Sequence, residues 1–332
     1  MHDASIPRRN LLFRIVSEIP GVTYGVVFLA ILFSIIRPRF MSVNNMLLIA
    51  RHSSVLLVAS IGMTMVILVS QIDLSVGSVM SLSGVVAAYA IRNGMDLVPA
   101  MALGIVCGLV TGALNGVMVA VFKFDYWIAT FGTMGIGAGM ALVVANGETL
   151  AVGSAGFGWI GNGRIGRIYI LTYLAVIFLT VMWFVLKKTR FGYNIYSIGG
   201  SEQAARLSGL NVVRNRIYVY MCSGFFSAVA GLMLASMGNS ASPIAGADYS
   251  FDVIAAVIIG GTSFDGGRGG LFGTVMGTLL VRILASGLNL MNILPTWQKA
   301  IIGIVIVAIL VADVLGEKRK RRRDMMRRYR DG

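Results

Sequence analysis

Long apolar stretches dominate the sequence and restrict what it can fold into. A helix that crosses a bilayer needs about 20 predominantly apolar residues. Of the 332 residues, 57% are hydrophobic and only 13% are charged, whereas soluble domains have about 25% charged residues. The sequence therefore predicts an all-α integral membrane protein. Eight clear stretches lie near residues 19–36, 52–70, 97–122, 126–146, 168–186, 216–237, 271–291 and 297–315.

Two further segments are assigned by an argument from charge. Residues 74–91 are long enough to cross but rich in Ser and Gly, and Val253 to Ile259 is a short apolar run. Basic residues favour the cytoplasmic side of a membrane. The loop 187–216 and the tail 316–332 are both basic, so the short run must cross to keep them on one side. The N-terminus, with Arg8 and Arg9, is also basic, so residues 74–91 must cross to keep it on the same side as the loop. The prediction is about ten spans with cytoplasmic N and C termini: an N-terminal segment 1–18, a transmembrane domain 19–315 and a cytoplasmic tail 316–332.

The net charge of +14 fits the same picture. A basic run beside a span fixes topology and contacts anionic lipid headgroups, and we favour membrane lipids over nucleic acid as its partner. Three arginines, Arg37, Arg39 and Arg51, fall on the external side, against the preference of basic residues for the cytoplasmic side. An amphipathic surface segment, FMSVNNMLLIA, would account for them. Cys107 and Cys222 lie in apolar segments without metal-like spacing, so we expect neither a disulfide nor a metal site.

Glycine spacing indicates how the helices pack. An isolated glycine weakens a helix by about 1 kcal/mol relative to alanine, so the 41 glycines need a reason. Gly104, Gly108, Gly112 and Gly116 recur every fourth residue, which makes a smooth ridge where a neighbouring helix can approach closely. We expect a compact bundle with little room for a large aqueous pore.

Two polar segments interrupt the apolar pattern, SQIDLSVGS at 70–78 and IIGGTSFDGGRGG at 258–270. We expect both at cytoplasmic turns. Asp73 has the spacing of a helix cap, and the glycines around Asp265 allow turn conformations that side chains forbid. The segments are therefore either structural turns or mobile hinges of a gate, because unwound Gly-rich backbone often lines transport paths. The candidate hinge residues are Asp73, Ser75, Gly77, Gly260, Gly261, Asp265, Gly266 and Gly267.

The polar loop 187–216, KKTRFGYNIYSIGGSEQAARLSGLNVVRNR, contains a short helix signal. Ser201 can cap a helix from Glu202 to about Ser208, and Gly209 suits the left-handed residue that ends it. Ala204, Leu207 and Ser208 share one face that could dock into another protein. The sequence has no GxxxxGK[ST] phosphate loop, so energy for any transport must come from outside the chain. The alternative is a solvated loop that only fixes topology.

The sequence resembles the permease subunits of bacterial sugar-uptake ABC transporters of the ribose, galactose, xylose and arabinose class, within the branched-chain-type permease superfamily. The resemblance covers nearly the whole chain. It is carried by GMTMVILVSQIDLSVGSVMSLSG, ALNGVMVAVFK with IATFGTM, TRFGYNIYSIGGSEQAARLSGLNV, and FDVIAAVIIGGTSFDGGRGGLFGTVMGTLL followed by GLNLM.

The resemblance implies a fold similar to the large (type II) ABC importers in the bacterial plasma (inner) membrane. It implies a second permease copy or paralogue, a cytoplasmic ATPase that binds ATP and Mg, and a periplasmic or lipid-anchored sugar-binding protein. The chain itself would need no cofactor. The family's coupling helix corresponds to Ser201–Leu210. The candidate coupling residues are Ser201, Glu202, Ala204, Ala205, Arg206 and Gly209.

Two residues depart from the family pattern. Gln71 stands where relatives usually have glycine. Arg282 lies within a span, where an arginine costs about 2.5–3.5 kcal/mol on insertion scales. It pairs with a carboxylate or carbonyl inside the bundle, or extends its guanidinium to the membrane interface, or lies on the permeation route and favours an anionic or sugar-acid substrate. The candidate substrate-path residues are Asn115, Trp127, Asn146, Arg282, Asn289 and Asn292.

We therefore expect a transporter subunit, not an enzyme, that moves a monosaccharide, a pentose or hexose, inward. The alternative is an ion-coupled secondary transporter without an ATPase. That class needs carboxylates or histidines near the membrane midplane, and the acidic residues cluster at predicted loop ends. The identity of the sugar cannot be read from the sequence.

Overall fold

The structure is a computed structural model that describes residues 21–294, 296–298, 300–305, 307–308 and 311. The predicted N-terminal segment 1–18 and the tail 316–332 lie outside the described residues. Six described helices are long and apolar enough to cross a membrane. They are α3 (Val43–Leu68), α5 (Leu97–Ala120), α6 (Tyr126–Ala145), α8 (Ile170–Lys188), α11 (Val212–Gly238) and α13 (Leu271–Leu290).

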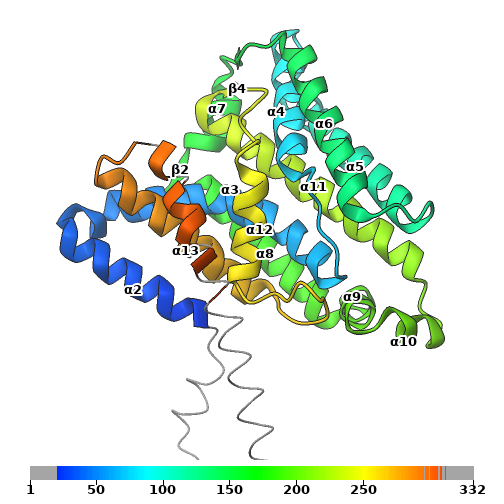
Figure 1. Cartoon of the computed structure of the whole chain (residues 1–332). Helices are drawn as coiled ribbons and strands as arrows, with labels where there is room; N and C mark the ends of the chain where they lie inside the picture. Colours follow the sequence, from blue (N-terminus) through cyan, green and yellow to red (C-terminus); the bar gives the residue numbers. More distant parts are fainter. Residues whose placement is uncertain (1–20, 295, 299, 306, 309–310, 312–332) are drawn as a thin grey trace, which may run out of the picture.

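Shorter helices complete the bundle (Figure 1). The apolar ones are α2 (Gly21–Ile36), α4 (Val76–Arg92) and α12 (Tyr249–Ile259), and further helical residues lie at 296–298 and 300–305. Together these elements agree with the expected all-α architecture of about ten membrane helices. The remaining elements are η1 (Pro38–Met41), α7 (Ala155–Asn162), α9 (Arg190–Gly200), α10 (Glu202–Leu207), and the strands β1 (Leu150–Ala151), β2 (Arg164–Ile165), β3 (Ile168–Tyr169) and β4 (Ser240–Ala241).

The two ends of the bundle carry different elements. At the lower end of Figure 1 lie α9 and α10, and at the upper end lie α7 and β4. Strand β4 pairs antiparallel with β1, and β2 pairs with β3. We call the end with α9 and α10 the cytoplasmic end, following the charge argument, and the opposite end the external end.

The glycine ridge on α5 packs as expected against a neighbouring helix. A Cβ atom at Gly108 would lie 2.4 Å from the carbonyl oxygen of Gly224, and one at Gly112 would lie 2.3 Å from that of Tyr220. Both partners are on α11. These distances are shorter than any real Cβ contact, so the two backbones touch directly and gain dispersion contacts that a side chain would prevent.

The expected amphipathic surface segment FMSVNNMLLIA is wrong. Most of it is the first two turns of α3, which begins at Val43 because the side chain of Ser42 caps the helix by accepting from the amide of Asn45. Arg51 then lies within α3. Its guanidinium donates to the carbonyl of Gly161 at 3.0 Å and to Oδ1 of Asn162 at 2.7 Å, so α7 satisfies the charge that the surface segment was meant to explain.

The polar loop contains one more helix than predicted. Helix α9 precedes α10 and is capped by Thr189, whose hydroxyl accepts from the amide of Gly192. Its glycines lower the helix propensity, so the sequence signal is weak. Packing provides the stability instead, since Ile195 and Ile198 are buried and Gly199 lies directly against the carbonyl of Leu68.

Candidate functional site

The first candidate hinge lies deeper in the bundle than predicted. Helix α3 ends at Leu68 and α4 begins only at Val76. The intervening residues climb from the cytoplasmic end into the bundle, where Asp73 is 1% exposed. Its Oδ2 accepts from the hydroxyl of Ser223 at 2.7 Å, about halfway along α11. The placement of Asp73 at a cytoplasmic turn is therefore wrong, because the chain turns at residues 69–70 and then runs into the bundle before α4 begins.

A buried polar network holds this unwound segment. Oδ1 of Asp73 accepts from the amide and the hydroxyl of Ser75 at 3.0 and 2.5 Å. The side-chain amide of Asn115 donates to the same hydroxyl at 2.9 Å, and Asn115 accepts from Thr133 at 2.8 Å. Ser75, rather than Asp73, is the residue that precedes the helix. The network joins the segment to α5, α6 and α11, and it occupies the polar groups of Asn115.

Helices α4 and α12 meet end to end inside the bundle. The amide of Gly77 donates to the hydroxyl of Ser250 at 3.0 Å, and the amide of Gly246 donates to the hydroxyl of Ser81 at 2.9 Å. A Cβ atom at Gly77 would lie 2.2 Å from the carbonyl oxygen of Gly246. We call these four residues the α4/α12 crossing.

The crossing divides the height of the bundle between two short helices. With 11 residues, α12 is about 16 Å long, roughly half of a 30 Å hydrocarbon core. It runs from the crossing to the cytoplasmic end, while α4 runs from the crossing to the external end. Both helices therefore present their N-terminal ends near the middle of the bundle, as the broken helices of transporters do.

The second candidate hinge lies at the cytoplasmic end, as expected. Gly261, Gly266 and Gly267 have φ values of +85°, +77° and +67°, which only glycine adopts without strain. The amide of Gly267 donates to the carbonyl of Leu68 at 2.9 Å. The hydroxyl of Ser70 donates to the backbone carbonyl of Asp265 at 2.7 Å, so the two hinge segments are in direct contact.

Other candidate hinge residues have structural contacts of their own. A Cβ atom at Gly260 would lie 2.4 Å from the carbonyl oxygen of Gly273, so Gly260 lets the end of α12 pack on α13. Gly199 of α9 lies against Gly267, and its carbonyl accepts from the hydroxyl of Ser70 at 3.5 Å. Helix α9 therefore contacts both hinge segments at the point where they join.

The predicted short helix is present as α10. The hydroxyl of Ser201 accepts from the amide of Ala204 at 3.2 Å, and Gly209 has a φ of +79°, so the predicted cap and stop are confirmed. Ala205 is buried at 3% exposure while Leu207 is 84% exposed. The exposed face of Ala204, Leu207 and Ser208 points away from the bundle.

Ion pairs fix α10 to the membrane helix that follows it. Glu202 pairs with Arg206 at 2.6 Å and also with Arg216 of α11. Partial burial raises the pKa of Glu202, but hydrogen bonds from Arg206 and Arg216 outweigh it and hold that pKa below its usual range. The carboxylate therefore stays ionised and keeps both contacts.

The six predicted substrate-path residues do not form one site. Trp127 is 56% exposed on the outer side of α6, and Asn146 and Asn292 are left-handed residues at helix ends, with φ of 50° and 57°. Arg282 pairs with Asp252 at 3.3 Å and lies over the ring of Tyr249, which agrees with the pairing interpretation. Only Arg282 and Asn289 share a cavity.

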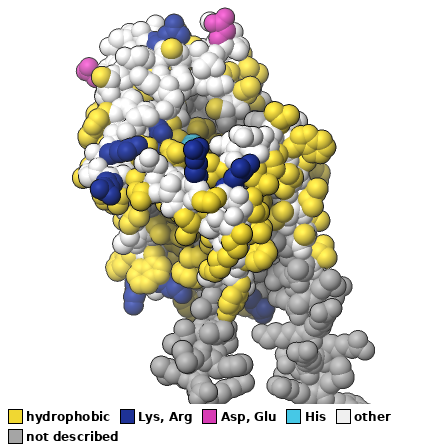
Figure 2. Space-filling model, turned by 90° about the vertical axis from the view of Figure 1, so that its left-hand side faces the viewer, with side chains coloured by type: hydrophobic (Ala, Val, Ile, Leu, Met, Phe, Trp, Pro, Cys, Tyr) yellow, Lys and Arg dark blue, Asp and Glu magenta, His cyan; other side chains and the backbone are white. Residues whose placement is uncertain are grey.

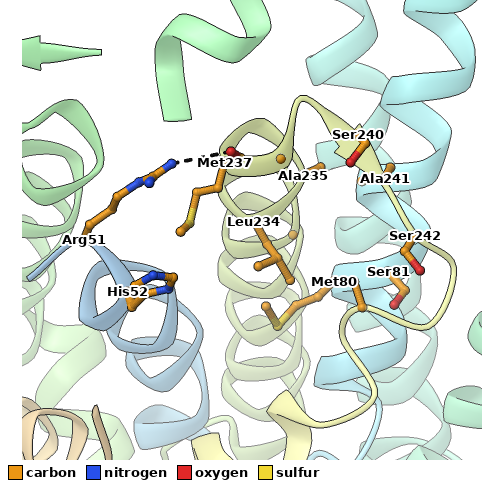
Figure 3. Close-up of a pocket in the computed structure, with 14 residues that line it drawn as sticks. Arg51, His52, Met80, Ser81, Leu234, Ala235, Met237, Ser240, Ala241 and Ser242 are labelled. Carbon is orange, nitrogen blue, oxygen red and sulfur yellow. Dashed lines mark hydrogen bonds between the residues drawn. The ribbon is translucent and has the colours of Figure 1, made fainter. Parts of the chain in front are cut away.

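Sequence reasoning missed a larger cavity in the external half of the bundle (Figure 3). It has a volume of about 410 Å³ and lies between α3, α4, α11 and the loop after β4. Arg51 and His52 are adjacent polar residues inside a long apolar helix, a signal that could have identified this wall. Its lining includes Arg51, His52, Met80, Ser81, Leu234, Ser240 and Ser242.

Within the part of the chain that the structure describes, no group of three or more His, Cys, Asp or Glu side chains could hold a metal ion. The arrangement instead consists of a cavity with mainly apolar walls and a few polar side chains above the α4/α12 crossing, two hinge segments below it and a docking face on α10. Such an arrangement can bind and pass a solute.

Comparisons with known proteins agree with this arrangement. The family model described as "Branched-chain amino acid transport system / permease component" matches residues 45–310. The chain is 39% identical over 302 residues to the ribose import permease protein of Haemophilus influenzae, covering 89% of this chain and 93% of that protein. It is 38% identical over 295 residues to the ribose import permease protein of Bacillus subtilis, covering 88% and 92%.

Two further comparisons extend the picture. The galactose/methyl galactoside import permease protein of Salmonella typhimurium is 34% identical over 303 residues, covering 86% of this chain and 90% of that protein. A solved inward-facing structure assigned to a metal-chelate type ABC transporter has a TM-score of 0.50 and 17% identity, covering 88% of this chain and 98% of that chain. At this identity the likeness concerns the fold.

Proposed function

Because this chain belongs to the permease component family of branched-chain amino acid transport systems, a family of multi-pass bacterial membrane proteins, we propose that it carries a monosaccharide into the cell. The sugar is a pentose or hexose, and ATP hydrolysis by a separate ATPase subunit drives its import. The observation that carries this proposal is the 39% identity over 302 residues to a ribose import permease protein. The relative named for galactose import supports the monosaccharide class.

The geometry of the cytoplasmic end supports coupling to an ATPase. Leu207 on α10 is exposed and apolar, which suits docking into a groove of a partner. Helix α10 follows α9 directly, and Gly199 of α9 touches Leu68 and Gly267. A displacement of α10 by the ATPase would therefore reach both hinge segments through one contact.

The full assembly in this proposal contains a second permease copy or paralogue, the ATPase with its ATP and Mg, and an external sugar-binding protein. The test is reconstitution in proteoliposomes. We expect radiolabelled D-ribose or D-galactose uptake only when the ATPase and ATP are enclosed in the vesicles and the binding protein is present outside. The test variant is Leu207→Glu, which adds a charge to the exposed face of α10 and leaves the buried Ala205 side unchanged. It should abolish uptake while the abundance of the protein in the membrane stays normal.

One observation favours ion-coupled transport as a second candidate function. Asp73 is a buried carboxylate in the middle of the bundle, the kind of group that such transporters use. Its two oxygens accept from Ser75 and Ser223, which is also what a structural anchor requires. The same proteoliposomes decide between the two, because uptake by the permease alone under a proton or sodium gradient would support ion coupling.

A further inference from the structure

The external half of the bundle contains two cavities that share one side chain. The larger, of about 410 Å³, extends from the external end of α11 down to Met80 and Ser81 of α4. The smaller, of about 240 Å³, lies between α3 and α13. His52 of α3 lines both. Figure 2 shows a hollow in this face with His and basic side chains beside it.

Figure 3 shows how the larger cavity is arranged. Arg51 and His52 extend from α3 on one side, Leu234 and Met237 face them from α11, and the serines lie across the cavity. The volume of about 410 Å³ falls within the range of about 300–1,000 Å³ that is typical of small-molecule sites. The cavity is therefore large enough for a monosaccharide.

The arginines around the cavities already have partners. The guanidinium of Arg51 donates to Gly161 and Asn162 and lies 4.8 Å above the ring of Tyr169. Arg282, at the smaller cavity, pairs with Asp252. These contacts hold both guanidinium groups against protein groups, and the neutral ligand class follows from the proposed monosaccharide function.

The remaining groups suit hydroxyl recognition. An imidazole can donate from one nitrogen and accept at the other, and serine hydroxyls and side-chain amides also do both. His52, Ser240 and Ser242 provide such groups in the larger cavity, and Asn45, Ser286 and Asn289 are added in the smaller one. Apolar walls from Met80 and Leu234 suit the C–H faces of a sugar ring.

We propose that His52 contacts the transported sugar in an external subsite formed by these two cavities, and that the ligand is a neutral monosaccharide. The proposal rests on the proposed function. The proposal also places the subsite on the external side of the α4/α12 crossing, because Ser81 lines the larger cavity and accepts from the amide of Gly246. The floor of the subsite is thus the α4/α12 crossing, and a bound sugar waits directly above the contact that closes the path.

The test is protection of a cysteine in place of His52. In a Cys107→Ser, Cys222→Ser background, His52→Cys is reconstituted with the ATPase and binding protein and treated with a membrane-impermeant charged methanethiosulfonate. D-ribose or D-galactose, whichever the proteoliposomes import, should slow the modification. At about ten times its dissociation constant a ligand leaves about a tenth of the sites free, so the rate should fall about tenfold.

Controls separate this subsite from other causes. Asn93→Cys, in the exposed turn between α4 and α5, should react at the same rate with and without sugar. Ser242→Cys and Asn289→Cys repeat the test for each cavity if His52→Cys does not fold. D-gluconate should protect none of them, and protection by gluconate in place of the neutral sugar would overturn the ligand class.

Two failures have different meanings. If the parent proteoliposomes import the sugar but it protects none of the three cavity cysteines, the subsite is wrong and the proposed function stands. If no sugar is imported with all subunits present, the proposed function is wrong. Uptake kinetics test the same contact between His52 and the sugar. The variant His52→Gln keeps a hydrogen-bond donor and an acceptor, so it should raise the KM for uptake less than His52→Ala does.

Discussion

The α4/α12 crossing makes a sharp prediction for Gly77→Ala. The new Cβ atom would lie 2.2 Å from the carbonyl oxygen of Gly246 and 2.5 Å from the hydroxyl of Ser250, whereas non-bonded heavy atoms prefer about 3.5–4.0 Å. The two helix ends must therefore separate by more than about 1 Å, since the nearest obstacle is backbone. The separation also weakens the hydrogen bond between Gly77 and Ser250.

The magnitude follows from three contributions. Overpacking costs about 1–3 kcal/mol, and the weakened hydrogen bond costs about 0.5–1.5 kcal/mol. The higher helix propensity of alanine offsets up to about 1 kcal/mol of this loss in the free energy of unfolding. We expect a net loss of about 0.5–4.5 kcal/mol in the free energy of unfolding.

Thermal unfolding in detergent measures this loss against a matched control. Gly132 lies in α6 with no atom within 4 Å of a new Cβ, so Gly132→Ala should gain the helix propensity and raise the unfolding temperature slightly. Gly246→Ala should resemble Gly77→Ala, and the double variant should lose less than the sum, because one separation accommodates both methyl groups. Equal unfolding temperatures for Gly77→Ala and Gly132→Ala would refute the reasoning.

Three more predictions concern single residues. Asp73→Ala should lower the free energy of unfolding by about 1–3 kcal/mol, because it leaves buried hydroxyls unpaired, and Asp73→Asn should cost less in the same detergent melts. Gly209→Val should cost about 1–2 kcal/mol through its left-handed φ alone, seen as faster hydrogen exchange of α10. The pKa of Glu202 is lowered in the folded protein, so its contribution is present above the ordinary glutamate pKa and is lost as the pH falls through the lower folded value. Hydrogen exchange of α10, corrected for its intrinsic pH dependence, should therefore speed up on acidification, and Glu202→Gln should remove that response.

Apolar length and local capping could be predicted from the sequence. The long helices follow from long apolar stretches, because a helix satisfies all its backbone polar groups inside a bilayer. The cap at Ser201 and the stop at Gly209 follow from local backbone chemistry. The glycine ridge of α5 belongs with them, because spacing alone places those glycines on one face.

Depth within the bundle could not be predicted. Asp73 lies in a polar segment that has the composition of a surface turn, and only the hydroxyl of Ser223, 150 residues away in the chain, shows that it is buried. The same limit applies to substrate contacts. Asn115 is an intramembrane amide as predicted, but its partners Ser75 and Thr133 occupy it, whereas His52 lies at a cavity that four distant segments create.

The division of the bundle height between α4 and α12 has a consequence for alternating access. A barrier made from a continuous helix can open only by breaking backbone hydrogen bonds or by moving the whole helix. If the crossing is the barrier, it is an end-to-end contact held by two hydrogen bonds, one between α4 and α12 and one between α4 and the turn before α12, each with a net contribution of about 0.5–1.5 kcal/mol. We expect the external half to open by movement of α4 and the cytoplasmic half by movement of α12, each as an intact helix and at separate times.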